Sequence, residues 1–154
     1  MNKIIVRVYG ILRDHDGRIL VSDEIINGAS FTKFPGGGLE FGEGIHDCLI
    51  REIKEELNLN VQVDEHIYTT DFFQRSAFNP AHQVLSVYYK LTALEPFHIN
   101  LNKQPFTFSE EAIAAYQKTE QMESFRLIPW NQFNPDVMSL PIDKVVAALL
   151  KSRY

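Results

Sequence analysis

The 154-residue sequence predicts an α/β fold in a single domain, residues 1–154. Several segments rich in Val, Ile and Tyr are bounded by turn residues, which is typical of strands. Other segments repeat apolar residues at helical spacing. The length, with 45% hydrophobic and 23% charged residues, suits one globular domain with a sizeable core. No repeat, low-complexity tract or linker divides the chain.

The N-terminal region is predicted to begin with a strand and a hairpin. Residues 3–12 are rich in Ile, Val and Tyr and predict the first strand. Asp14–Gly17 is a turn signal, because Asp-Gly suits positive φ, so we expect residues 18–23 to pair back as the second arm. Three short segments follow: a loop at 27–33, a compact turn at 34–38 and a short strand at 39–41.

A helix is predicted from Gly44 or Ile45 to about Asn58. Its apolar stripe recurs at i, i+4 and i+8, at Leu49, Ile53 and Leu57. Gly44 is an acceptable N-cap, and Asn58 tolerates the left-handed conformation that ends many helices.

The remaining sequence predicts further strands and two helices. Strand-like segments are 60–63, 66–73, 83–93 and 125–130. A loop is expected at 74–81, because it contains Asn79-Pro80. Helices are expected at 109–118 and 141–152.

The composition argues against several classes of function. The net charge of −5 argues against broad binding to nucleic acid, which needs a basic face. No stretch approaches the ~20 apolar residues of a membrane span, and the N-terminus lacks a signal-peptide pattern. The single cysteine, Cys48, excludes an internal disulfide and favours a reducing, cytoplasmic location. The sequence leaves the oligomeric state open, with a homodimer as one option.

Three glutamates on the predicted helix 45–58 are the main chemical signal. Glu52, Glu55 and Glu56 lie at i, i+3 and i+4, so their carboxylates stack on one side. Acids on a helix are often only a solvated face. Like charges this close repel, however, and a divalent cation such as Mg²⁺, which prefers oxygen ligands, resolves the repulsion.

The segment Gly37–Leu59, GGLEFGEGIHDCLIREIKEELNL, resembles the signature box of the Nudix hydrolase family. The matching positions are Gly37, Glu43, Arg51, Glu52, Ile53, Glu55, Glu56 and Leu59. Asn58 stands where the family usually has Gly, but both residues adopt positive φ. Phe34-Pro35-Gly36-Gly37 upstream is also similar to the family.

This resemblance implies an α/β/α sandwich with a mixed β-sheet between helices. It implies an enzyme that cleaves the diphosphate linkage of a nucleoside diphosphate joined to another moiety, such as a nucleotide sugar, ADP-ribose or a nucleoside triphosphate. The alternative is a non-catalytic, nucleotide-sensing module, but such modules generally lose box acids and this chain keeps them.

The resemblance also assigns site residues. Glu52, Glu55, Glu56 and the backbone carbonyl of Gly36 would hold Mg²⁺ or Mn²⁺. An ion pair between Arg51 and Glu43 would orient the acidic helix. The general base stays open, because Glu55 or an acid outside the box can fill that role.

Two weaker groups complete the predicted site. Some relatives place an auxiliary metal-binding or base glutamate in a loop where Glu123 lies, before the strand 125–130; the alternative is a solvated acid. Three other acids compete for that role: Glu110, Glu111 and Glu120.

The second group is a set of substrate contacts in the segment 66–75. Phe72 or Phe73 would stack on a base, and Arg75 would meet a phosphate. Because adjacent strand residues face opposite ways, we expect at least one of the two phenylalanines to lie in the core.

Overall fold

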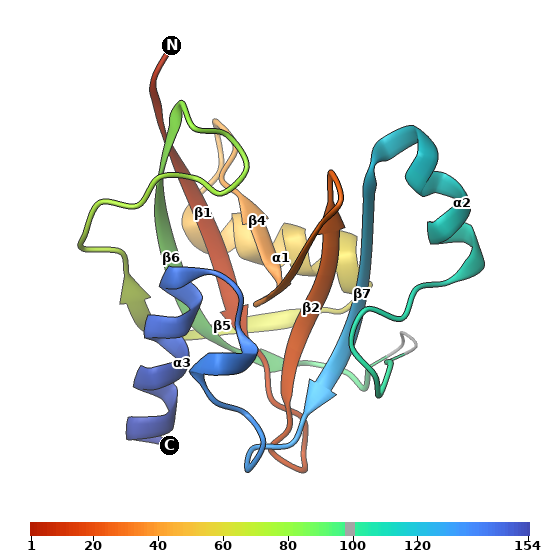
Figure 1. Ribbon diagram of the computed structural model, residues 1–154. Helices are drawn as coiled ribbons and strands as arrows, with labels where there is room; N and C mark the ends of the chain where they lie inside the picture. The colour runs from red at the N-terminus through yellow and green to blue at the C-terminus, as the bar shows by residue number, and fades with distance from the viewer. Residues whose placement is uncertain (98–100) are drawn as a thin grey trace. The chain divides into compact units, whose positions relative to one another are not determined.

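The computed structural model describes residues 1–97 and 101–154, which fall into two compact units. Unit 1 comprises Met1–Leu12 and the described part of Pro35–Ile99, and unit 2 comprises Arg13–Phe34 and the described part of Asn100–Tyr154 (Figure 1). Each unit has its own sheet. Whether the chain is a single domain remains a prediction.

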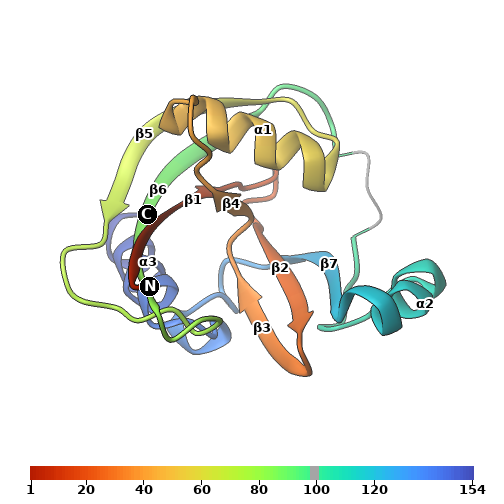
Figure 2. The ribbon, with the colours of Figure 1, turned by 90° about the horizontal axis from the view of Figure 1, so that it is seen from above.

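Unit 1 is built on a mixed four-stranded sheet in the order β4-β1-β6-β5. The strands are β1 (Lys3–Ile11), β4 (Gly36–Gly38), β5 (Val61–Thr69) and β6 (His82–Ala93). β1 runs parallel to β6, and the other two pairings are antiparallel. Helix α1 (Ile45–Leu57) packs along this sheet, as Figure 2 shows, and contacts β1, β4 and β5.

Helix α1 forms as its sequence predicts. The stripe of Leu49, Ile53 and Leu57 is buried, as the spacing of these residues requires. Gly44 is the N-cap in an extended conformation. Asn58 ends the helix at φ 49°, and its backbone N–H donates to the Lys54 carbonyl at 3.0 Å. Asn58 therefore adopts the left-handed conformation that glycine would supply.

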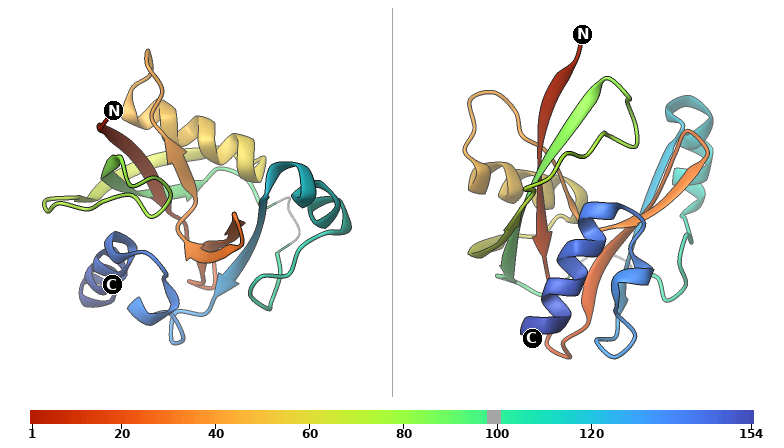
Figure 3. Two further views of the ribbon diagram at one scale, coloured as in Figure 1. Left: turned by 45° about the horizontal axis from the view of Figure 1, so that its top comes forward. Right: turned by 60° about the vertical axis from the view of Figure 1, so that its left-hand side comes forward.

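Unit 2 holds an antiparallel three-stranded sheet in the order β3-β2-β7. The strands are β2 (Ile19–Ile26), β3 (Ala29–Lys33) and β7 (Gln121–Ile128). Figure 3 shows this unit with α2 (Glu110–Thr119), the short 3-10 helix η1 (Pro135–Val137) and α3 (Pro141–Arg153). Ser109 caps α2 by accepting the Ala112 backbone N–H at 3.1 Å.

The predicted hairpin between residues 3–12 and 18–23 is wrong. β2 pairs with β3 and β7, and only an isolated bridge joins Arg13 to Ile19. The segment 27–33 is not a loop, because Asn27 and Gly28 form a tight turn at φ 49° and 81° that pairs β3 back onto β2. Positive φ at both central residues is the geometry of the favoured two-residue hairpin.

Three strand boundaries also differ from prediction. The glycines 36–38 form β4, and residues 39–41 lie outside any strand. β5 ends at Thr69 rather than at residue 73. β7 begins at Gln121 rather than 125, because Glu120 adopts φ 55° and turns the chain directly from α2 into the strand.

The α/β fold class with a mixed sheet is confirmed. In the described part of the chain, no helix combines the length and apolarity that crossing a bilayer requires.

Candidate active site

The glycine strand β4 brings backbone close to β1. Gly36 pairs with Tyr9, Gly37 with Val8 and Gly38 with Arg7. Gly36 has φ +151°, and a Cβ there would lie 2.1 Å from the Val8 carbonyl oxygen. Such an approach excludes any side chain, so glycine at this position is a steric requirement of the pairing.

Gly37 has a different role, because the Glu52 carboxylate occupies the space that a side chain at this position would need. A Cβ on Gly37 would lie 2.2 Å from the Glu52 carboxyl carbon and 2.4 Å from each of its oxygens. The Glu52 carboxylate therefore lies directly against the glycine backbone. The glycine strand and the acidic helix α1 meet at this contact.

Arg51 connects the acids of the box. Its Nε and Nη2 donate to Glu43 Oε2 and Oε1 at 2.9 and 2.7 Å, in the two-pronged geometry that matches guanidinium to carboxylate. Nη1 donates to Glu52 Oε1 at 3.0 Å and to Glu55 Oε2 at 3.2 Å. Nη2 also donates to the Gly38 carbonyl at 3.2 Å. The predicted Arg51–Glu43 ion pair is thus present, and the same guanidinium also contacts Glu52 and Glu55.

The same network sets the electrostatics of Glu43. Hydrogen bonds from Arg51 and from the Glu40 backbone N–H hold the pKa of Glu43 at about 2, below its ordinary 4.5. In return, the hydrogen bonds to Glu43 raise the pKa of Arg51 further above its ordinary value. Glu43 and Arg51 therefore stay charged across the range in which most proteins are folded.

Cys48 lies beneath this network and is buried. Burial, together with the neighbouring Glu43 carboxylate, raises the pKa of the Cys48 thiol to about 12. Thiolate is the reactive form of cysteine, so Cys48 is an inert packing residue, as its sequence context indicates.

The acids of α1 fit a divalent cation by their chemistry. They offer carboxylate oxygens, the ligands that Mg²⁺ and Mn²⁺ prefer. Glu52 is held against Gly37, whereas the Glu55 side chain is 60% exposed and turns toward Arg51. A cation at this face would compete with Arg51 for Glu55, whose several rotatable bonds allow it to swing.

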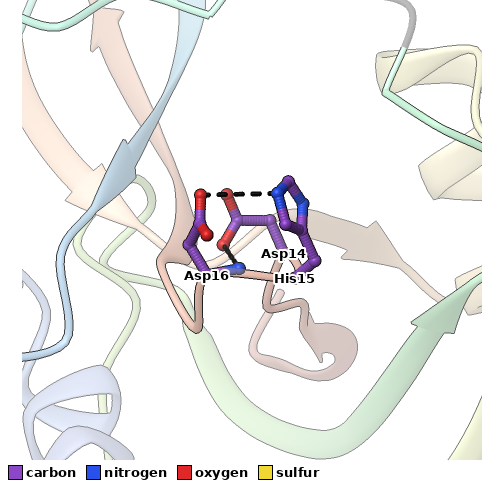
Figure 4. Close-up of side chains that lie close together, drawn as sticks. All are labelled: Asp14, His15 and Asp16. Carbon is purple, nitrogen blue, oxygen red and sulfur yellow. Dashed lines mark hydrogen bonds and ion pairs between the residues drawn. The ribbon is translucent and has the colours of Figure 1, made fainter.

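A different acidic group has its ligand atoms already gathered. Within the described residues, one set of His, Cys, Asp and Glu has all of its ligand atoms within 4.8 Å: Asp14, His15 and Asp16 (Figure 4). This set forms the turn before β2. Burial alone would raise the pKa of Asp14, but hydrogen bonds from Arg18 lower it below its ordinary value. Because Arg18 Nη2 lies 2.6 Å from Asp14 Oδ2, we interpret Asp14 as an anchor of the turn.

Glu123 lies in unit 2 on strand β7, not in a loop before the last strand as predicted. Its carboxylate accepts a hydrogen bond from Ser22 Oγ at 2.6 Å, and its strand partner in register is Glu24. The competing acids lie on or beside α2, with Glu110 and Glu111 in the first turn and Glu120 at the C-cap.

The predicted substrate contacts lie in an exposed segment after β5. Phe72 is 41% exposed and Phe73 63% exposed, so the expectation that one of them lies in the core is wrong. The strand ends at Thr69, so the alternation of faces no longer applies. Arg75 lies over the Phe73 ring at 5.8 Å from its centroid.

Two contributors to the Arg51 network escaped the sequence prediction. Glu40 lies 3.8 Å from Arg51 Nη1 and donates its backbone N–H to Glu43. The Gly38 carbonyl accepts from Arg51. The spacing Glu40-Phe-Gly-Glu43 was the available signal for Glu40, whereas a backbone carbonyl leaves no trace in a sequence.

Comparison with known proteins places this geometry in a family. Residues 3–149 match the family model described as the NUDIX domain, so the chain belongs to the Nudix family. It is 26% identical over 126 residues to Nudix hydrolase 2 of Arabidopsis thaliana, an alignment that covers 78% of this chain and 37% of that protein. The chain therefore spans little more than a third of the length of this curated relative.

Solved structures agree on the fold. A MutT protein from Methanosarcina mazei Go1 superposes with a TM-score of 0.66 at 13% identity, covering 97% of this chain and 93% of that one. The ORF135 protein of E. coli gives a TM-score of 0.63 at 17% identity, covering 98% and 91%. These likenesses show a shared Nudix fold.

Proposed function

We propose that this protein is a hydrolase that uses Mg²⁺ or Mn²⁺ to cleave the diphosphate linkage of a nucleoside diphosphate joined to another moiety. One observation carries the proposal. Arg51 holds Glu43, Glu52 and Glu55 in one network while the Glu52 carboxylate packs on Gly37. This arrangement gathers several carboxylates beside one face of α1, and a bound divalent cation would offset the repulsion between them that the single charge of Arg51 leaves.

The metal ligands in this proposal are Glu52, Glu55, Glu56 and the Gly36 backbone carbonyl. When bound, the ion neutralises phosphate charge and lowers the pKa of a water molecule. Arg51 orients the acids, and Glu43 fixes Arg51 through the paired hydrogen bonds. Diphosphate cleavage asks mainly for positioning and charge neutralisation from the protein, which this network supplies.

A general base takes the proton of the attacking water. Glu55 is one candidate, because its side chain is exposed and belongs to the box. Glu123 is the other, with Ser22 holding its carboxylate. Phe72, Phe73 and Arg75 are proposed to contact the nucleotide. The substrate is a nucleotide-derived small molecule in a cytoplasmic setting, and nucleotide sugars, ADP-ribose and nucleoside triphosphates are the classes to test.

Hydrolysis of these three substrate classes with and without Mg²⁺ or Mn²⁺ tests the proposal. Glu55→Gln nearly preserves shape and should lower turnover at least ~10²-fold. Asp47→Asn, an exposed acid in the first turn of the same helix, is the matched control and should stay near wild type. Nucleotide binding with no turnover of any class would instead favour the sensing module.

A further inference from the structure

A hollow with polar and basic lining residues lies in unit 1, away from the box. It has a volume of about 170 Å³, and Lys3, Arg75 and His82 are among its lining residues. Phe73 and the polar residues Asn2 and Gln83 also line it. Figure 3 shows its setting, where the segment between β5 and β6 lies beside the N-terminal end of β1.

Backbone pairing fixes this hollow. Lys3 pairs with His82 in the parallel register of β1 and β6, and the Lys3 backbone N–H donates to the Ala81 carbonyl at 3.0 Å. Arg75 forms a bridge with Gln83 and donates from Nη1 to the Pro80 carbonyl. The lining residues therefore come from two strands and a loop that are hydrogen-bonded to one another.

The charge of the hollow contrasts with that of the protein. None of the described residues that line it is acidic, although the chain has a net charge of −5. Within the described residues, neither Lys3 nor Arg75 forms an ion pair with a carboxylate. Arg75 uses one N–H on Pro80 and has five in all, so it keeps donors for an anion.

An exposed aromatic ring accompanies these cations. Phe73 is 63% exposed, with the Arg75 guanidinium 5.8 Å from its ring centroid. Proteins that bind single-stranded nucleic acid combine cations, which meet the phosphates, with aromatic rings, on which any base can stack. A planar ring that carries phosphate matches both features.

The hollow is separated from the acids of the box along β1. Gly37 pairs with Val8, five residues beyond Lys3 on the same strand. At about 3.3 Å per residue, this is roughly 16 Å. A group bound in the hollow is thus distinct from the one held over Glu52.

We propose that this hollow binds a nucleoside monophosphate group, with Lys3 and Arg75 on the phosphate and Phe73 against the base. The group is either the far half of the substrate or a free nucleotide. Where it is the far half of the substrate, the inference rests on the proposed function.

The test is calorimetric titration of the full chain with AMP and with inorganic phosphate in excess chelator, so that no metal or turnover enters. Lys3→Gln should weaken both ligands about tenfold or more, because a hydrogen bond to a charged group is lost. Phe73→Leu should weaken AMP at least about fivefold and leave phosphate unchanged. Lys118→Gln, an exposed lysine on α2, is the control.

Two results would overturn the proposal: no saturable binding of AMP, or equal AMP affinity in wild type and Lys3→Gln with both proteins folded. If AMP raises KM and leaves kcat unchanged in a turnover assay, the hollow binds the far half of the substrate. If AMP inhibits with any other pattern, and Lys3→Gln abolishes that inhibition, the hollow binds free nucleotide. Loss of turnover in Glu55→Gln with AMP binding intact separates this site from the box.

Discussion

Replacing Gly37 by alanine would test the central contact of the proposed site. The new Cβ would lie 2.2 Å from the Glu52 carboxyl carbon, whereas ordinary van der Waals contact begins near 3.4 Å. The carboxylate must therefore retreat by about 1.2 Å, the difference between these distances. This movement breaks or lengthens its 3.0 Å hydrogen bond from Arg51 Nη1.

We expect Gly37→Ala to lower the catalytic rate strongly while changing the stability of the fold little. A displacement of about 1 Å in a catalytic group costs ~10²-fold in rate, which corresponds to about 2.7 kcal/mol of activation free energy. The atoms that must move are the flexible end of a side chain, so the cost in folding should stay below about 1 kcal/mol, or roughly 2–4 °C in melting temperature. The assay is kcat and KM with Mg²⁺, beside a thermal melt.

The neighbouring glycines are matched controls. A Cβ on Gly38 would meet only Arg7 Nη1 at 3.7 Å, so Gly38→Ala should be nearly silent. A Cβ on Gly36 would press on Val8 backbone at 2.1 Å, so Gly36→Ala should cost about 2–4 kcal/mol in unfolding free energy. Wild-type turnover in Gly37→Ala would refute the reasoning, as would equal losses of turnover in the Gly37 and Gly38 variants.

Four further outcomes are expected. Arg51→Lys should lower kcat more than metal affinity, because an ammonium cannot form the paired hydrogen bonds to Glu43; wild-type kinetics would make Arg51 a surface charge. Because the pKa of Glu43 is lowered, Glu43 contributes its full stabilisation above pH 4.5 and loses it as pH falls toward about 2. Urea titrations should therefore show that the unfolding free energy of Glu43→Gln depends less on pH over that range than that of wild type. Mg²⁺ at one hundred times its dissociation constant should stabilise the protein by about 2.7 kcal/mol, a melting shift of roughly 5–11 °C that shrinks in Glu55→Gln; an equal shift in both proteins would argue against the carboxylate site. Glu123→Gln should slow single-turnover hydrolysis more than Glu120→Gln does, and the reverse order would show that Glu123 is not the auxiliary acid.

Sequence alone was sufficient where structure depends on residues close in the chain. The helix from Ile45, its N-cap at Gly44 and its left-handed end at Asn58 all follow from local periodicity and capping. The Arg51–Glu43 pair was also predicted, because the family resemblance specifies both positions.

The sequence carries a second local hairpin signal. Asn27-Gly28 is a strong hairpin signal, and it turns β2 back onto β3. The prediction instead used Asp16-Gly17, where only an isolated bridge forms. Asp16-Gly17 and Asn27-Gly28 are both good turn formers, so the pairing of the strands that follow decides which of them closes a hairpin.

Tertiary structure alone decided the rest, because strand partners and side-chain contacts arise between residues far apart in the chain. The parallel pairing of β1 with β6 brings Lys3 beside His82, which lie 79 positions apart. The packing of Glu52 on Gly37 depends on β4 meeting α1. Phe72 and Phe73 are both exposed because β5 ends at Thr69. A sequence states which residues can take a role at such points, and only the folded backbone determines which of them meet.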